Sequence, residues 1–194
     1  MSERRISARL FLVMSGLPGS GKTTLGRNLA SALDLPMLDK DEILEGLFDS
    51  LGIGDAEWRN RLSRSADEVL RRLAVQSGGA VLASFWRHPQ STSESGTSTS
   101  WLNILPGPVV EVYCECTPET AAERFLARQR HKGHLDDRKR TDEVVAGFVR
   151  WAAFGPLGVG ALIRVDTSVA VDVESVVSRL RISILDTVVP RPRS

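Results

Sequence analysis

The chain has 194 residues, of which 42% are hydrophobic and 25% are charged; this length suits one domain with its own core. Its 25 Lys and Arg residues nearly balance 24 Asp and Glu residues, for a net charge of +1. This balance excludes the general attraction to nucleic acid or anionic membrane that strongly basic proteins have.

The sequence shows no signal for a membrane or for an oxidising compartment. No apolar stretch approaches the length needed to span a bilayer, and Met1–Arg5 carries no signal-type apolar segment. The two cysteines, Cys114 and Cys116, lie two residues apart in an apparent strand. Their side chains would point to one face with backbone between them, which is poor geometry for a disulfide. We therefore expect free thiols and a cytoplasmic protein.

The first elements form a strand, a loop and a helix. The apolar run 10–14 predicts a strand buried on both faces. Apolar residues at helical spacing over 24–33 predict a helix. The segment between them fits the pattern of a glycine, four arbitrary residues and Gly-Lys-Ser/Thr. It reads Gly16, Leu17, Pro18, Gly19, Ser20, Gly21, Lys22, Thr23 and Thr24.

Each residue type in this loop suits a nucleoside triphosphate. Glycines let backbone N–H groups approach phosphate oxygens, and the helix that follows adds free N–H groups and the positive end of its dipole. Lys22 is expected to reach the β- and γ-phosphates, and the Thr23 hydroxyl is expected to bind Mg²⁺. We therefore predict that residues 16–24 bind the nucleotide and that Thr23 is the metal ligand.

A short second strand is predicted over 36–38, and Asp39-Lys40-Asp41 follows it. In a doubly wound sheet this strand end faces the phosphates, because the phosphate loop lies on a neighbouring strand. A carboxylate there can accept a proton from an attacking hydroxyl or hold Mg²⁺ through water. We predict a catalytic role for Asp41 and a metal or substrate role for Asp39, and one of the two also caps the next helix.

The rest of the chain continues to alternate strands and helices. Segment 90–100 is rich in Ser, Thr and Gly, which indicates a flexible loop. Pro190–Ser194 is expected to be a loose tail. Residues 1–194 are therefore predicted to form one three-layer α/β domain with a parallel sheet. Strands are expected over 80–86, 109–116 and 161–165, and helices after Asp41 and over 56–76, 118–130, 142–154 and 173–185.

The phosphate loop, the aspartate before a helix and a later arginine-rich stretch together resemble the P-loop small-molecule kinases. Gluconate kinase, chloramphenicol phosphotransferase, the zeta toxins and the kinase domain of polynucleotide kinase are close in pattern. The resemblance implies a five-stranded parallel sheet of order 2-3-1-4-5 and a small helical lid at about 124–142. Lys40-Asp41-Glu42 lines up with the Arg-Asp-Asp run that supplies the base in polynucleotide kinase, which implies that Asp41 is the base.

The same resemblance implies roles for several further residues. Family lids use arginines to neutralise charge on the transferring phosphoryl group. The candidates here are Arg124 and Arg128, four apart on one expected helix face, with Arg130 beyond them. Arg87 follows the third strand, where adenylate-kinase-like proteins place a substrate arginine. Thr167 lies in an Asp-Thr-Ser run that resembles the loop beside the adenine.

Two departures from the patterns of related kinases limit the expected substrate and the expected ligands of Mg²⁺. Leu44 stands where polynucleotide kinase has the arginine that grips a 3′ phosphate, so we expect no nucleic-acid substrate. The third strand has no aspartate at the Walker B position, as in gluconate kinase-like enzymes. Mg²⁺ is therefore expected to be held by Thr23, the phosphates and water, with Asp39 or Asp41 in the outer shell.

We predict an ATP- and Mg²⁺-dependent phosphotransferase that moves the γ-phosphate of ATP to a hydroxyl of a small molecule. The acceptor would be a sugar, an antibiotic, a nucleoside or a nucleotide sugar, and it would lie among Asp41, Trp58, Arg87 and the 90–100 loop. Two alternatives stay open: a nucleotide-binding regulatory or toxin-like module that acts on a protein partner, and a polynucleotide 5′-kinase. A GTPase is not expected, because no Asn-Lys-x-Asp guanine reader is present.

Overall fold

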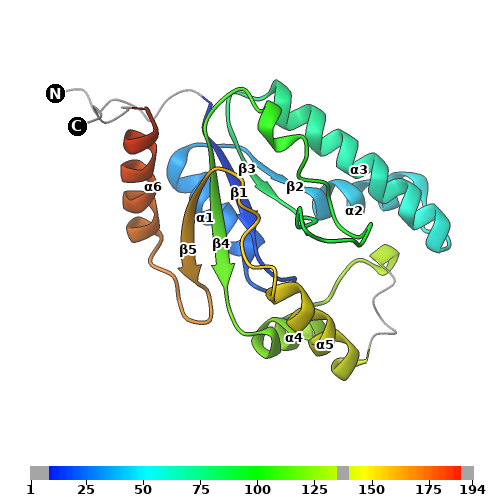
Figure 1. Ribbon diagram of the computed structural model, residues 1–194. Helices are drawn as coiled ribbons and strands as arrows, with labels where there is room; N and C mark the ends of the chain where they lie inside the picture. Colours follow the sequence, from blue (N-terminus) through cyan, green and yellow to red (C-terminus); the bar gives the residue numbers. More distant parts are fainter. Residues whose placement is uncertain (1–8, 135–139, 189–194) are drawn as a thin grey trace.

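Five parallel strands form one sheet in the order β2-β3-β1-β4-β5 (Figure 1). The computed structural model describes residues 9–134 and 140–188, with side chains to residue 184. Our expectations for Met1–Arg5, Pro190–Ser194 and the lid residues 135–139 therefore lie outside the described residues. The predicted sheet order and α/β class are confirmed. The strands are β1 Phe11–Ser15, β2 Met37–Asp39, β3 Ala80–Ala83, β4 Val109–Glu115 and β5 Ala161–Asp166.

Helices cover both faces of the sheet, and two more lie together beyond the carboxyl ends of the strands (Figure 1). The pair beyond the strand ends is α4 and α5, which follow β4 in the chain. The helices are α1 Lys22–Leu33, α2 Lys40–Leu51, α3 Ala56–Gln76, α4 Pro118–Ala127, α5 Thr141–Ala152 and α6 Val173–Val188. Short 3-10 turns cover Leu102–Ile104 and Lys132–His134.

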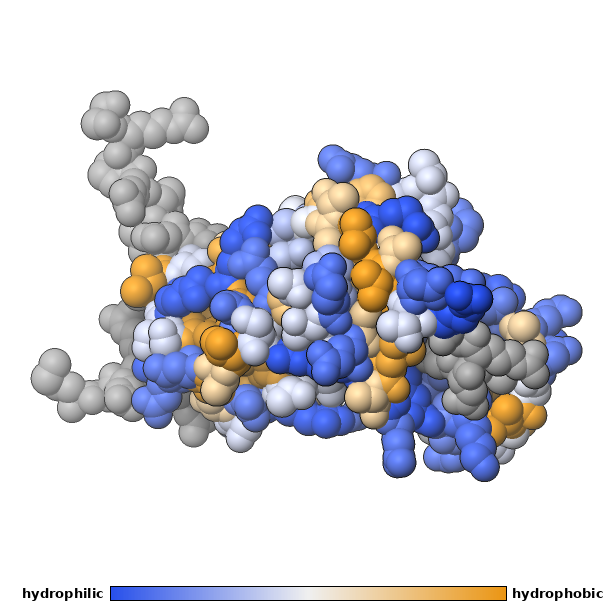
Figure 2. Space-filling model, turned by 90° about the horizontal axis from the view of Figure 1, so that it is seen from below, coloured by the Kyte–Doolittle hydropathy of each residue, from blue (hydrophilic) through white to orange (hydrophobic). Residues whose placement is uncertain are grey.

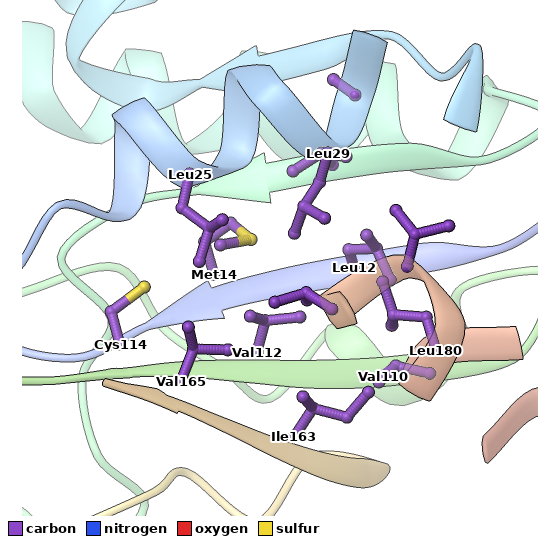
Figure 3. Close-up of a cluster of buried hydrophobic side chains, with 14 of the residues drawn as sticks. Leu12, Met14, Leu25, Leu29, Val110, Val112, Cys114, Ile163, Val165 and Leu180 are labelled. Carbon is purple, nitrogen blue, oxygen red and sulfur yellow. The ribbon is translucent and has the colours of Figure 1, made fainter. Parts of the chain in front are cut away.

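The core on one face of the sheet joins the strands to α1 and α6. Alternate residues of β1 and β4 point to this face, since side chains alternate along a strand. They meet leucines spaced one turn apart on α1 and a leucine of α6 (Figure 3). Burial of this cluster fixes α1, and with it the loop that precedes α1, against the sheet. The labelled residues of the cluster are Leu12, Met14, Leu25, Leu29, Val110, Val112, Cys114, Ile163, Val165 and Leu180.

The opposite face packs against α3 and the segments around residues 101–105 and 157. Phe11 and Val13 of β1 and Leu82 of β3 are fully buried there against Leu70 and Ala74 of α3. The apolar residues of α3 recur at the spacing of one helix face, which turns its other face away from this core. The face of α3 that points away from the sheet is therefore free to carry polar residues.

Two predicted element ends are wrong. β3 ends at Ala83 rather than at Trp86, because Trp86 instead forms a bridge with Thr97 of the 90–100 segment. That segment, predicted to be flexible, is thus fixed at Thr97, which is fully buried. Helix α4 ends at Ala127 instead of reaching Arg130, and Arg128 already has an extended backbone.

The molecular surface drawn in Figure 2 is mostly hydrophilic, and its hydrophobic residues form narrow groups among charged ones. Within residues 9–134 and 140–188, no helix has both the length and the hydrophobicity needed to cross a bilayer.

Candidate active site

A cleft of about 1360 Å³ opens at the carboxyl ends of the strands, where open α/β sheets place their ligands. It brings together the loop before α1, the start of α2, one face of α3 and parts of α4 and α5. Most of the predicted site residues line it. They are Pro18, Gly19, Gly21, Lys22, Thr23, Thr24, Asp39, Asp41, Arg87, Arg124, Arg128 and Thr167.

Four predicted residues are not on the cleft wall, namely Gly16, Leu17, Ser20 and Trp58. Gly16 and Leu17 border a smaller cavity behind the loop, but their carbonyl groups face Lys22. Trp58 does not reach the cleft: its indole N–H donates to the carbonyl of Gly52 at 3.0 Å, and its ring packs with the α2–α3 cluster. The structure therefore does not bring Trp58 to the other predicted substrate residues. The Trp58 indole is instead held by the short loop that joins α2 to α3.

The loop before α1 is held in a tight, concave form. Gly19 has φ +80°, and a side chain there would lie 2.2 Å from the carbonyl oxygen of Ala121, so only glycine fits. Gly21 also has a left-handed backbone and caps α1. The Ser20 hydroxyl is buried and has no hydrogen-bond partner within the described residues. These features fit a loop whose polar groups are completed by a phosphate.

Lys22 lies along this loop and lacks an anionic partner at hydrogen-bond distance among the described residues. Its ammonium donates to the carbonyl groups of Leu17 at 2.6 Å and Gly16 at 3.0 Å. Burial lowers the pKa of Lys22 below its ordinary value, and the nearby carboxylates Asp41 and Asp39 oppose that shift. A half-buried cation bonded to neutral carbonyls is favourably placed to receive a phosphate.

Thr23 and Asp39 together form an oxygen-rich corner beside the loop. The Thr23 hydroxyl donates to Asp39 Oδ2 at 2.8 Å, and Asp39 Oδ1 accepts the backbone N–H of Asp41 at 2.9 Å, which caps α2. Burial raises the pKa of the Asp39 carboxyl, and the hydrogen bond from Thr23 opposes the shift. A hydroxyl and a buried carboxylate side by side are the kind of ligands Mg²⁺ prefers. The oxygen atoms of Thr23 and Asp39 therefore fit the predicted Mg²⁺ site.

The arginines after β4 are arranged differently from the prediction. Because α4 ends at Ala127, Arg124 and Arg128 do not share a helix face. Arg124 donates to the carbonyl groups of Thr167 at 2.8 Å and Ser168 at 3.2 Å, and so joins α4 to the loop after β5. Arg128 is exposed at the cleft edge. Arg130 is the arginine that reaches Asp41, with Nη2 2.7 Å from Oδ2.

Sequence reasoning missed a hydrogen-bonded network in the far half of the cleft. The buried Lys40 ammonium lies 3.0 Å from both the Ser63 hydroxyl and Asp67 Oδ1. Asp67 Oδ1 also accepts the Thr97 hydroxyl at 2.6 Å, and Thr97 lies 2.5 Å from the Ser84 hydroxyl. The network joins α2, α3, the end of β3 and the 90–100 segment. The spacing of Asn60, Ser63, Arg64 and Asp67 along one face of α3 was the signal that could have revealed it.

An aromatic wall, also missed from the sequence, borders the same cleft. The rings of Phe85 and Trp151 are 4.6 Å apart, and Phe148 lies 5.6 Å from both Trp151 and Phe125. Phe85 follows β3, Phe125 lies on α4, and the other two lie on α5. Aromatic rings at these distances pack favourably against one another and give this part of the cleft an apolar wall.

The fold, the phosphate loop and the cleft define a kinase-like P-loop phosphotransferase. A protein family described as AAA domain matches residues 11–153, and the chain belongs to this family. Arg87, Arg124 and the phosphate loop all lie within the matched region. The match ends just after α5, so β5, Thr167 and α6 lie outside it.

Individual relatives and solved structures agree with this class. The chain is similar to the adenylyl-sulfate kinase of Burkholderia ambifaria, with 31% identity over 62% of this chain and 70% of that protein. It is 33% identical to the shikimate kinase of Corynebacterium glutamicum over 48% of this chain and 57% of that enzyme. A solved candidate kinase of Chloroflexus aurantiacus has a TM-score of 0.73 at 28% identity, covering 91% of this chain and 98% of that one.

Proposed function

We propose that the protein uses ATP and Mg²⁺ to phosphorylate a hydroxyl group of a small molecule. The observation that carries this proposal is the position of Asp41, which lines the same cleft as Lys22 and Thr23 of the phosphate loop. Its side chain is 35% exposed, so it is open to an acceptor. Relatives named as kinases of adenylyl sulfate and shikimate support the phosphotransferase assignment.

The loop and the corner beside it would hold the nucleotide and the metal. Residues 16–24 bind the phosphates, with Lys22 turning from the loop carbonyls to the β- and γ-phosphates. Thr23 and Asp39 would hold Mg²⁺, and the cation would supply charge neutralisation for the phosphates. Thr167 and Arg124 border the nucleoside end of the cleft, and Arg128 lies free at its edge to approach the phosphates.

Asp41 is the group that acts on the acceptor. Its carboxylate accepts the proton of the acceptor hydroxyl while that oxygen bonds to the γ-phosphorus and the bond from phosphorus to the ADP oxygen breaks. Arg87 and the Lys40–Asp67 network border the half of the cleft beyond Asp41, and we assign that half to the acceptor. The aromatic wall shields the reacting groups from water, which would otherwise compete as the acceptor.

A transfer screen tests the proposal. The protein is incubated with Mg²⁺ and ATP labelled in its γ-phosphate, together with sugars, aminoglycosides, nucleosides, nucleotide sugars or 5′-hydroxyl oligonucleotides. We expect label in one small-molecule class and none after Lys22→Met, which removes the phosphate-binding ammonium.

Other outcomes of the screen identify the alternatives. Label in the oligonucleotide alone would identify a polynucleotide 5′-kinase. ATP binding without transfer to any acceptor, together with a protein that copurifies, would identify a regulatory or toxin-like module. Either result would overturn the proposal.

A further inference from the structure

The carboxylate assigned as the base is already bound by an arginine from the segment after α4. Arg130 Nη2 donates to Asp41 Oδ2 at 2.7 Å, and the Arg130 side chain is only 14% exposed. Its guanidinium also lies over the Phe125 ring, 5.7 Å from the centroid. A charge-assisted bond of this length, with one partner largely buried, fixes the rotamer of Asp41 more firmly than an exposed ion pair would.

The four residues that follow, His131–His134, form what we call the docking turn. His131 stacks on Phe48 of α2 at 5.3 Å between ring centroids, and His134 meets the same ring edge-on at 5.7 Å. A side chain at Gly133 would lie 2.4 Å from Phe48 Cδ2, so the backbone lies directly against the ring. The turn is therefore fixed on the helix that begins with Lys40 and Asp41.

Polar contacts anchor the same turn. The His134 ring is almost fully buried, with Nε2 2.9 Å from Glu45 Oε1, and the His134 carbonyl accepts Arg59 Nε of α3 at 3.1 Å. His131 Nε2 lies 3.3 Å from Asp49 Oδ1. The turn thus contacts α2 at two carboxylates and α3 at one arginine, and Arg130 immediately precedes it.

From these contacts we infer that Arg130 is a positioning residue for Asp41, and that the docking turn holds Arg130 in place. The inference rests on the proposed function and deepens it: the base would be oriented only while the segment after α4 is docked on α2. Oδ2 is occupied by Arg130, which leaves Oδ1 for the acceptor hydroxyl. This task differs from the lid roles predicted for Arg124 and Arg128.

The orientation of the carboxylate matters for phosphoryl transfer, because the acceptor hydroxyl must be aligned with the phosphorus. A displacement of about 1 Å can lower a rate by about 100-fold. The rival interpretation is that Arg130 blocks the base, and it predicts the opposite effect on turnover.

The first test removes Arg130. We expect Arg130→Ala to lower kcat for acceptor phosphorylation by about 10- to 100-fold while KM for ATP stays within about twofold. Added guanidinium should restore part of the lost kcat, because it can occupy the vacated position beside Asp41. Arg72→Ala is the matched control, since Arg72 forms an ion pair of the same 2.7 Å length with Glu68 on the exposed side of α3.

The second test displaces the docking turn without substituting Arg130. Gly133→Ala forces the turn away from Phe48 and should lower kcat as Arg130→Ala does. Gly46→Ala, on the same helix α2 with open space around it, is the control and should leave kcat unchanged. If the turn acts through Arg130, the double variant should be no slower than the slower single variant.

The possible results separate this inference from the proposed function. Unchanged or faster turnover in Arg130→Ala overturns the inference, and so does a defect confined to KM for ATP or fully additive losses in the double variant. All of these require a wild-type protein that phosphorylates an acceptor. A wild-type protein that transfers phosphate to no acceptor in the screen overturns the proposed function instead.

Discussion

At the scale of single residues, the site depends on polar groups that a ligand would complete. Lys22 is half-buried and bonded to neutral carbonyls, and the Ser20 hydroxyl is buried without a hydrogen bond within the described residues. Asp39 is buried beside the Thr23 hydroxyl. Each of these arrangements costs free energy in the folded protein unless a ligand completes it. A phosphate and a divalent cation would complete all three.

The role of Asp39 can be tested by removing its charge alone. Asp39→Asn keeps an acceptor for the Asp41 N–H, so the cap of α2 survives. We expect the Mg²⁺ concentration for half-maximal activity to rise by about tenfold or more, because a neutral amide is a poorer ligand for a hard cation. A magnesium titration of the transfer rate measures this.

The control for this prediction is Asp55→Asn. Asp55 caps α3 in the same way, by accepting the Trp58 N–H at 2.9 Å, but it does not line the cleft. Its substitution should leave the magnesium requirement unchanged. An identical magnesium curve for Asp39→Asn and the wild-type protein would contradict a metal role for Asp39.

At the scale of elements, one buried carboxylate ties a loop to the central strands. Glu111 of β4 is fully buried and accepts the Ser15 hydroxyl at 2.6 Å and the backbone N–H groups of Leu157 at 2.7 Å and Gly158 at 2.9 Å. The loop between α5 and β5 therefore packs on the sheet where no helix covers it. Ser15 directly precedes the phosphate loop, so the same contacts support the site.

We expect Glu111→Gln to lower the free energy of unfolding by about 1–3 kcal/mol, because an amide leaves buried donors without an acceptor. Denaturation by urea measures the change. Glu123→Gln, on the exposed side of α4, should have almost no effect. A Glu111→Gln protein as stable as the wild type would show that the carboxylate does not hold the loop.

The elements also show how far the sequence alone leads. Apolar strands, the glycine-rich loop and the helical spacing of leucines predicted the parallel sheet and α1, because these features depend on local pattern. The strand order was implied by the resemblance to the P-loop kinases. The end of α4, the pairing of Trp86 with Thr97 and the position of Trp58 could not be predicted. They depend on contacts made outside a single helix or strand, such as those of Trp86 with Thr97 and of Trp58 with Gly52.

The same limit applies to the site. The loop and Asp41 were recognisable from spacing, whereas the contact of Arg130 with Asp41, the Lys40–Asp67 network and the role of Glu111 were not predicted. Arg130, Lys40 and Glu111 are charged residues whose partners lie more than twenty positions away in the sequence. Sequence periodicity does not report such pairs, since it describes only neighbours on one element.

At the scale of the whole molecule, the cleft brings together parts of nearly every element. The half that we propose for the nucleotide is formed by the loop before α1 and by the loop after β5, and the far half by α2, α3 and the segment after β3. Asp41 lies where the two halves meet. A phosphotransferase needs this arrangement, because both substrates must meet in line with water excluded.

The most direct test of the account is the rate of phosphate transfer by Asp41→Asn with the acceptor identified in the screen. We predict a fall in kcat of about 100-fold or more, with the dissociation constant for ATP nearly unchanged, because the amide cannot accept the hydroxyl proton. A variant that transfers phosphate at the wild-type rate would contradict the claim that Asp41 acts on the acceptor.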